Sequence, residues 1–583
     1  MKTSGHVKLT RGNKTSIISL VLMFLTVNAT QAATTGFNQT AAGPYDYNTI
    51  GNWVGNTING TWDTSLTNTA AQTVTFAADT TLTTGLTFSY AGNYALTLDA
   101  SAAGTNTITL GGNIGLNTGS GSSANVTIGN ASNHLNVNLG GATRTLTVAT
   151  NRTLTIIDTV TNGAIIKAGA GTLTLSGANT YTNGTTISAG TVIAGNANAL
   201  GTSGAITLGD VNSGTNAIQL SATVAAISRP ITVANQGSGT VTFYTSGGDN
   251  GGRFAGAITL NRNISIQAGN NINFGQGGIS GAGDVTIVAA GGYSVYFGAI
   301  NGGGSANTFS GNVHVLTSGI LNLGSGWASS VNLIPDASTV NVAGTLIIGK
   351  GGNNETIDAL TGSGSVSLPS SAANRLTIGS AGGSGTFSGI ISSLGGITKT
   401  GAGTQTLSGV NTYSGTTVIT NGTLLVNGKL TGTGAVTVYS GGTLGGTGLV
   451  LGATSVVSGG TISPGEPATN NGIGKFTVSN SVTFASGSIF VAQISTNGLA
   501  DKLASSGTIT NLNATLSLSL ANANIHQETL FTIMSATNIV GTFNGLPEGA
   551  ILSAGGRSFA ISYPGNTNVV LRALAEGTII QFF

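Results

Sequence analysis

The chain has 583 residues, of which 94 are glycine and none is cysteine, and only 6% are charged and 5% aromatic. Glycine without a three-residue period excludes collagen, and alternating Thr, Val and Ile with few charges argue against disorder. The lack of cysteine excludes disulfides and thiolate metal sites, so stability must come from packing and hydrogen bonds.

The N-terminus has the pattern of an export signal. Basic residues precede an apolar run at 17–27, which is well short of the roughly 20 residues that span a bilayer, and small residues follow. We therefore expect residues 1–32 to be removed as a signal peptide. Removal leaves 14 basic and 16 acidic residues, a net charge of −2. Because the remaining Lys and Arg are scattered, nucleic acid is not an expected partner.

Aromatic residues gather after the signal, at Tyr45, Tyr47, Trp53 and Trp62. Such a cluster can stack on sugar rings or plug the open end of an apolar core, and the second use is the more common one. We interpret it as an N-terminal plug.

Short alternating stretches dominate the rest of the chain. Period-two alternation places one face inward and Thr or Asn outward. Beyond the signal segment, no stretch has apolar residues at helical spacing. The pattern predicts an all-β protein, with early strands at 107–110, 135–139, 144–148 and 153–157.

Two stretches are near-copies of each other. Residues 167–191, KAGAGTLTLSGANTYTNGTTISAGT, align without a gap to residues 399–423, KTGAGTQTLSGVNTYSGTTVITNGT. A worn third copy starts at Asn307, with Phe309 in place of the tyrosine and one residue inserted. Self-similarity of this kind indicates a chain built by stacking one supersecondary unit, because no single copy could bury its apolar face alone.

A finer period comes from the triplet Gly-Thr-(Leu/Val/Ile), which starts at Gly171, Gly190, Gly422, Gly442 and Gly460. Steps of about 20 residues fit one turn of a β-helix. We expect the glycine to supply a corner with positive φ and the apolar residue to point toward the axis.

The repeat resembles the autotransporter-associated beta-strand repeat, also called the passenger-associated transport repeat. Its pattern is Gly-x-Gly-Thr-Leu-x-Leu-Ser-Gly-x-Asn-Thr-Tyr, followed by Gly-Thr-Thr and Gly-Thr-Leu. Gln405 departs from the pattern, since a polar amide stands where the first copy has Leu173. The resemblance implies an exported, right-handed parallel β-helix (β-solenoid) over residues 33–470. Its repeats would cover 167–195, 306–324 and 399–427.

From residue 471 glycine becomes sparser and longer strands are predicted at 476–478, 488–494 and 514–520. We interpret 471–583 as a C-terminal β-domain or cap, and its segment 500–503 is similar to the end of passenger regions in the same family. The outer-membrane barrel usual in that family would need far more chain, so we expect another export route or a separate partner.

Candidate catalytic groups are few. His134, His314 and His526 are far apart, and a serine triad needs a histidine held between a hydroxyl and a carboxylate. We expect each histidine to be satisfied within the fold or solvent-facing. Calcium is suggested by glycine-rich fragments at Asp249 and Asp284, but calcium repeats work in tandem and these stand alone, so we interpret both as surface turns.

Two aspartate pairs offer a sharper alternative. Asp79 with Asp99, and Asp336 with Asp358, are each separated by about one predicted turn, so they could stack as the acid and base of a β-helical polysaccharide lyase or glycoside hydrolase. Coincidence is the competing interpretation, because 16 acidic residues are spread over the chain.

These observations favour a non-enzymatic structural or adhesive protein at the cell surface or outside the cell. It would present a polar wall of Thr, Ser and Asn to glycans, to surface proteins or to further copies of itself. We expect no catalytic residue, cofactor or metal site, and no transmembrane segment in the mature chain.

Overall fold

The structure, a computed structural model, describes residues 45–46, 61–62, 71–88, 95–101, 104–117, 125–223, 226–245, 253–274, 277–289, 292–298, 305–324, 333–349, 354–466, 472–521 and 524–575. The chain divides into two compact units, Met1–Ile218 and Gln219–Phe583. The predicted signal peptide lies outside the described residues, as do Tyr47 and Trp53, so the signal and the aromatic plug remain predictions.

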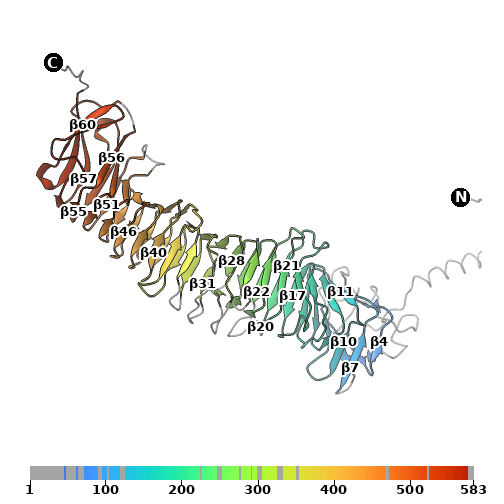
Figure 1. Ribbon diagram of the computed structural model, residues 1–583. Coiled ribbons are helices and arrows are strands. Elements are labelled where there is room, and N and C mark those ends of the chain that lie inside the picture. The colour runs from blue at the N-terminus through green and yellow to red at the C-terminus, as the bar shows by residue number, and fades with distance from the viewer. Residues whose placement is uncertain are drawn as a thin grey trace, which may run out of the picture. The chain divides into compact units, whose positions relative to one another are not determined.

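The first unit is built from three parallel ladders of short strands (Figure 1). The first ladder contains β1 (Tyr45–Asp46), β3 (Gln72–Phe76), β6 (Leu96–Ala100), β9 (Val126–Ile128), β12 (Thr153–Ile156), β15 (Thr172–Leu175) and β17 (Gly190–Ala194). The second contains β2 (Thr61–Trp62), β5 (Leu86–Phe88), β8 (Ile114–Leu116), β11 (Thr143–Val148), β14 (Ala164–Ala168), β16 (Thr185–Ile187) and β18 (Ile206–Leu208). The third contains β4 (Thr80–Thr81), β7 (Thr105–Thr109), β10 (His134–Asn138) and β13 (Val160–Thr161). The boundary between the units falls within β19 (Ile218–Ala222).

The second unit repeats this architecture over more rungs. Its longest ladder contains β22 (Val241–Thr245), β25 (Ile264–Ala268), β28 (Val285–Ala289), β30 (Val313–Val315), β32 (Thr339–Val342), β35 (Ala359–Gly362), β38 (Gly385–Phe387), β41 (Thr404–Leu407), β44 (Gly422–Val426), β47 (Gly442–Gly446), β50 (Thr461–Pro464), β53 (Ile489–Ile494) and β56 (Thr515–Leu520). A short ladder contains β21 (Ile231–Val233), β24 (Ile258–Leu260) and β27 (Ile279–Gly281).

Three further ladders complete this unit. One contains β20 (Ala226–Ile227), β23 (Arg253–Phe254), β26 (Ile272–Phe274), β29 (Val295–Phe297), β31 (Ile320–Leu323), β33 (Thr345–Ile348), β36 (Ser365–Ser367) and β39 (Ile390–Ser392). Another contains β34 (Glu355–Ile357), β37 (Arg375–Ile378), β40 (Gly396–Lys399), β43 (Thr417–Ile419), β46 (Val436–Val438), β49 (Thr454–Val456), β52 (Val482–Phe484), β55 (Thr508–Asn511) and β58 (Asn538–Val540). The last contains β42 (Val410–Asn411), β45 (Lys429–Leu430), β48 (Leu449–Val450), β51 (Lys475–Val478), β54 (Lys502–Ser505), β57 (Leu530–Ser535), β61 (Asn568–Ala573), β60 (Arg557–Ser562) and β59 (Ile551–Ala554).

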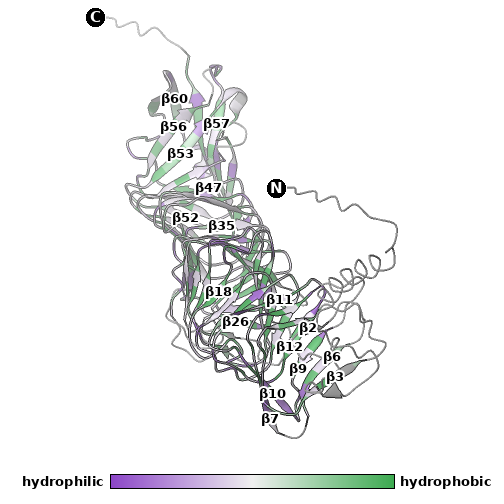
Figure 2. Ribbon diagram, turned by 90° about the vertical axis from the view of Figure 1, so that its right-hand side faces the viewer, coloured by the Kyte–Doolittle hydropathy of each residue, from purple (hydrophilic) through white to green (hydrophobic). Residues whose placement is uncertain are grey.

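Each unit is therefore a parallel β-solenoid, which confirms the predicted fold class. Like residues stack on like residues: Leu173 and Leu175 pair with Leu154 and Ile156 of the rung before, and all four are buried. Thr174 lies between them on the outer face. Figure 2 shows this alternation as bands of hydrophobic and paler or polar residues along the strands. The rung length also agrees with the sequence, since Thr423 of β44 pairs with Thr443 of β47.

The corner glycines follow the prediction only in part. Gly190 and Gly422 have positive φ of 74° and 64°, whereas Gly171, Gly442 and Gly460 do not. At Gly442 an added Cβ would lie 2.6 Å from a carbonyl oxygen of the previous rung. The close stacking of backbones, rather than a left-handed conformation, therefore requires glycine there.

The C-terminal region closes the solenoid with a reversal of strand direction. Parallel pairing continues past residue 471, where the change in composition predicted a C-terminal β-domain, as far as the β55–β58 pair. Among the strands of the described residues, antiparallel pairing joins β57 to β61, β61 to β60 and β60 to β59. Phe543, 1% exposed, stacks on Phe490 with ring centroids 6.0 Å apart and so packs against the last apolar layer.

Helical geometry within the described residues is limited to the short 3-10 turns η4 (Thr496–Gly498) and η5 (Pro564–Asn566). None of them has the length or the apolar character of a membrane-crossing helix.

Candidate functional site

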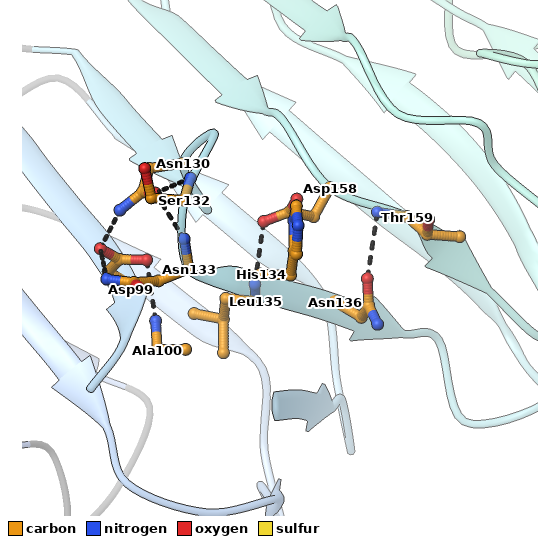
Figure 3. Close-up of polar contacts among 10 residues, drawn as sticks. All are labelled: Asp99, Ala100, Asn130, Ser132, Asn133, His134, Leu135, Asn136, Asp158 and Thr159. Carbon is orange, nitrogen blue, oxygen red and sulfur yellow. Dashed lines mark hydrogen bonds and ion pairs between the residues drawn. The ribbon is translucent and has the colours of Figure 1, made fainter. Parts of the chain in front are cut away.

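The most concentrated group of polar side chains in the first unit lies at the start of β10 (Figure 3). His134 opens this strand, and its Nδ1 lies 2.7 Å from Oδ1 of Asp158, which follows β12. The other carboxylate oxygen of Asp158 accepts the backbone N–H of Leu135 at 2.8 Å. The Asp158 side chain is 7% exposed and that of His134 is 53% exposed. The buried carboxylate therefore fixes the strand, and the imidazole lies at its solvent side.

Asp99 organises the neighbouring turn. It lies in β6, and its carboxylate accepts the backbone N–H of Ala100 at 2.9 Å and the side-chain amides of Asn130 and Asn133. The carbonyl oxygen of the Asn130 side chain in turn accepts the backbone N–H of Ser132 and Asn133. These contacts hold the turn between β9 and β10 in one conformation (Figure 3).

The His134–Asp158 pair has the geometry of the orienting half of a catalytic triad, but the nucleophilic half is missing from it. Among the described residues no hydroxyl is hydrogen-bonded to His134, and Ser132 contributes its backbone rather than its hydroxyl to the turn. Within the described residues, no group of three or more His, Cys, Asp or Glu side chains could hold a metal ion. The arrangement is suited to fixing a turn.

In each aspartate pair singled out in the sequence, the two aspartates lie at different register positions. Asp99 is paired with Thr75, while Asp79 accepts the backbone N–H of Thr107 at 2.8 Å. In the second pair, Asp358 accepts two backbone N–H groups of the turn after β37, at 2.9 and 2.8 Å. The backbone N–H of Asp358 bonds to Ser338, two residues beyond Asp336. The carboxylates of Asp79, Asp99 and Asp358 thus each tie a turn to a neighbouring rung.

The remaining predicted residues lie at the surface of the second unit. His314 in β30 has Nε2 3.9 Å from Oδ2 of Asp284, and both side chains are partly exposed. Asp284 accepts the backbone N–H of Asn312 at 2.7 Å, so this calcium-like fragment forms a turn. Asp249 lies outside the described residues. The backbone carbonyl of His526 accepts the N–H of Thr529 in a turn.

Each near-copy buries a lysine that sequence reasoning did not single out. The Nζ of Lys167 donates to the carbonyl oxygens of Ala168, Gly169 and Ala189 at 2.9, 2.6 and 2.9 Å. Lys399 donates to the carbonyls at the same offsets of one, two and 22 residues. Both side chains have no exposed surface, and burial lowers the pKa of Lys167 to about 7 and also lowers that of Lys399. The lysine closes the chain reversal between two strands.

A buried asparagine bridges three rungs in all three copies. Asn179 accepts the backbone N–H of Val160 at 2.7 Å and donates to the carbonyl of Ala199 at 2.6 Å. Asn411 and Asn307 make the same two kinds of contact, to the rung before and to the rung after. The structure therefore places the worn third copy in the same role as the two clear ones.

The structure also explains why the third copy can have a phenylalanine where the other two have a tyrosine. In the second copy the hydroxyl oxygens of Tyr413 and Thr417 lie 2.6 Å apart in a buried pair, and the first copy has the same pair at 2.7 Å. In the third copy Phe309 replaces the tyrosine and Val313 stands four residues later, both at most 1% exposed. Both hydroxyls are lost together, so neither is left unsatisfied.

Gln405, the other departure from the repeat pattern, uses its side chain to pair with the backbone of Leu360, two rungs earlier. Its side chain is 1% exposed, donates to the carbonyl of Leu360 at 2.9 Å and accepts the Leu360 N–H at 3.1 Å. The intervening rung has Gly385 opposite it, which leaves space for the amide to reach across. A polar residue at this apolar position is thus fully hydrogen-bonded.

Comparisons with known proteins give one family match and one similar solved structure. Residues 165–194 and 397–426 match the family model of the passenger-associated-transport-repeat. None of the curated proteins matches the chain. Among solved structures, the chain is similar to the crystal structure of the Haemophilus influenzae Hap adhesin, at 13% identity and a TM-score of 0.27. The similarity covers 82% of this chain and 64% of that one, so the chain spans less than two thirds of the adhesin structure. The resemblance seen in the sequence is confirmed: the chain contains the passenger-associated-transport-repeat in two copies.

Proposed function

We propose that the protein is an exported structural and adhesive β-solenoid, located at the cell surface or outside the cell, that binds through its polar outer wall and has no catalytic role. The repeats are named for association with transported passenger regions, and they support the export part of this proposal.

The outer wall is the observation on which the adhesive role depends. Outward-facing threonines stack in register, as in Thr423, Thr443 and Thr461 of three successive strands of the second unit. Parallel strands lie about 4.8 Å apart, so the hydroxyls form regular rows that can hydrogen-bond an extended partner at many points. With only 6% charged residues, the wall binds by many weak polar contacts rather than by charge.

Polysaccharide cleavage is the competing function, and it requires two carboxyl groups on either side of a glycosidic bond, about 5–10 Å apart. Asp79 instead accepts the backbone N–H of Thr107 in β7, and Asp358 accepts backbone N–H groups of the turn after β37. These contacts favour a structural role for the aspartates.

The test uses the full-length chain. Cells that produce it should carry it in a protease-accessible surface or extracellular form and adhere to polysaccharide-coated surfaces more than cells that lack it. The purified protein should release no reducing ends from a polysaccharide panel. Retention inside the cell would contradict the export proposal. Release of reducing ends that is lost in Asp336→Ala or Asp79→Ala would overturn the non-enzymatic one.

A further inference from the structure

The outer wall of the second unit has a hollow near its C-terminal end. A cavity of about 380 Å³ opens across β44, β47, β50, β53 and β56, at the lower end of the roughly 300–1,000 Å³ typical of ligand sites. Its polar lining includes Thr423, Thr443, Gln493 and Ser519, and its apolar lining includes Leu425 and Val491. All of them alternate with more deeply buried residues, so they lie on the outward face of the ladder.

A position without a side chain lies next to two of the lining residues. Gly445 pairs with Leu425 on one side and with Ser463 on the other. A Cβ at Gly445 would lie 2.4 Å from the Ser463 carbonyl oxygen and 3.2 Å from the Leu425 side chain. Leu425 therefore leans over the glycine and is only 8% exposed, although it belongs to the outer face. The result is a flat aliphatic floor between rows of hydroxyls.

One wall of the hollow is held by a buried carboxylate. Asp501, 2% exposed, accepts the backbone N–H of Gln493 at 2.9 Å and that of Gly474 at 2.8 Å. The Asp501 N–H donates in return to the Gln493 carbonyl. Gln493 is thus fixed at its backbone from both directions, which preorganises its side chain toward the hollow.

The polar groups of the lining are available to a ligand. Among the described residues, the hydroxyls of Thr423 and Thr443 and the side-chain amide of Gln493 have no protein hydrogen-bond partner. None of the lining residues is cationic, and the one carboxylate, Asp501, already accepts two backbone hydrogen bonds. This combination suits an uncharged ligand that carries many hydroxyls and has an apolar face.

We propose that the hollow binds a neutral oligosaccharide segment, with Thr443 and Gln493 hydrogen-bonding the sugar hydroxyls and Leu425 packing against a ring face. The proposal rests on the adhesive function and names the class of ligand for it. A polyanionic glycan would find no counter-charge here, and an extended peptide would leave its backbone donors without a row of carbonyls on this face.

Titration calorimetry on the full-length protein tests the assignment. The probes are hexasaccharides of β-1,4-glucan, α-1,4-glucan, β-1,4-mannan and β-1,4-xylan, with oligogalacturonate as the acidic comparison. We expect saturable binding of at least one neutral probe, unchanged when the salt concentration is raised. Thr443→Val and Gln493→Ala should each weaken binding about tenfold, the effect of one lost hydrogen bond of about 1.4 kcal/mol. Thr174→Val, an outward threonine of the first unit, is the matched control and should leave binding unchanged.

Three results would overturn the assignment: no neutral probe binds, only oligogalacturonate binds, or both hollow variants bind as tightly as the control. The outcome is separable from the adhesive function. If cells adhere and yet no neutral probe binds, the hollow is wrongly assigned and adhesion resides elsewhere on the wall. If a neutral probe binds in the hollow and cells do not adhere, the ligand site stands and the adhesive role fails.

Discussion

The buried hydroxyl pair of the second repeat can be removed at little cost only if both members are removed together. Tyr413 and Thr417 are 3% and 2% exposed, and their oxygens, 2.6 Å apart, have no other side-chain partner within the described residues. Burial raises the pKa of Tyr413 to about 12, so the phenol stays protonated under ordinary conditions. Tyr413→Phe alone strands the threonine hydroxyl, and Thr417→Val alone strands the phenol; each should destabilise by about 1–3 kcal/mol.

The double variant reproduces what the third copy already has in Phe309 and Val313. It should cost less than about 1 kcal/mol, so the double-mutant cycle should show a coupling of at least about 1 kcal/mol. Hydrogen exchange of the β43 and β46 amides measures this locally, and urea unfolding followed by circular dichroism measures it for the whole chain. Thr437→Val, an outward threonine on β46, is the control and should stay within about 0.5 kcal/mol. Additive costs in the double variant would refute the reasoning.

Three further perturbations test the buried polar groups. Burial raises the pKa of Glu355 to about 8 from an ordinary 4.5, so between these pH values the folded state binds more protons than the unfolded state. The free energy of unfolding should therefore fall as pH rises through this window, by up to roughly 5 kcal/mol. In Glu355→Gln the unfolding midpoint should no longer show this dependence on pH. Gln405→Leu should destabilise by about 1–3 kcal/mol in urea unfolding, because it leaves a buried N–H and C=O of β35 unpaired, and an unchanged midpoint would contradict the contact seen here. Asp158→Ala should destabilise the fold by about 1–3 kcal/mol, because the backbone N–H of Leu135 at the start of β10 loses its acceptor. His134→Ala should cost less than about 1 kcal/mol, because the imidazole is half exposed. Equal losses of stability in thermal unfolding would show that the imidazole contributes as much as the carboxylate.

Much of the fold could be predicted from the sequence, because successive rungs of the solenoid repeat the same residue pattern along the chain. Alternation located β10, β11 and β12, and the triplets at Gly171 and Gly190 gave the register that stacks Leu173 on Val192. The worn copy at Asn307 was detectable from three or four residues, because the bridging asparagine is required in each copy. Composition was a weaker guide to the C-terminal end: fewer glycines signalled longer strands, but the parallel pairing continued through them.

The site could be predicted far less well, because its contacts depend on which corner a residue occupies. His134 and Asp158 are 24 residues apart, close to one rung, and were not considered as a pair. Asp79 and Asp99 have a similar spacing but lie at different corners. Spacing alone gives the rung and not the corner, since strand and turn lengths vary between rungs. The hollow was still less visible, because its lining comes from five strands spread between Thr423 and Ser519.

The constraints inside a rung and those on its outer face are separate, and this separation explains how such a chain can change what it binds. Inside a rung, the buried polar groups are hydrogen-bonded by nearby partners. A lysine donates to three carbonyls, an asparagine bridges three rungs, and a tyrosine and a threonine form a hydroxyl pair that can be lost as a unit. Outward residues such as Thr443 and Gln493 take no part in these contacts. Substituting them alters the wall at a cost typical of surface positions, within about 0.5 kcal/mol, whereas the same change at Asn411 would unpair backbone groups of two neighbouring rungs. The residues of the outer wall can therefore diverge while the stack beneath them is retained.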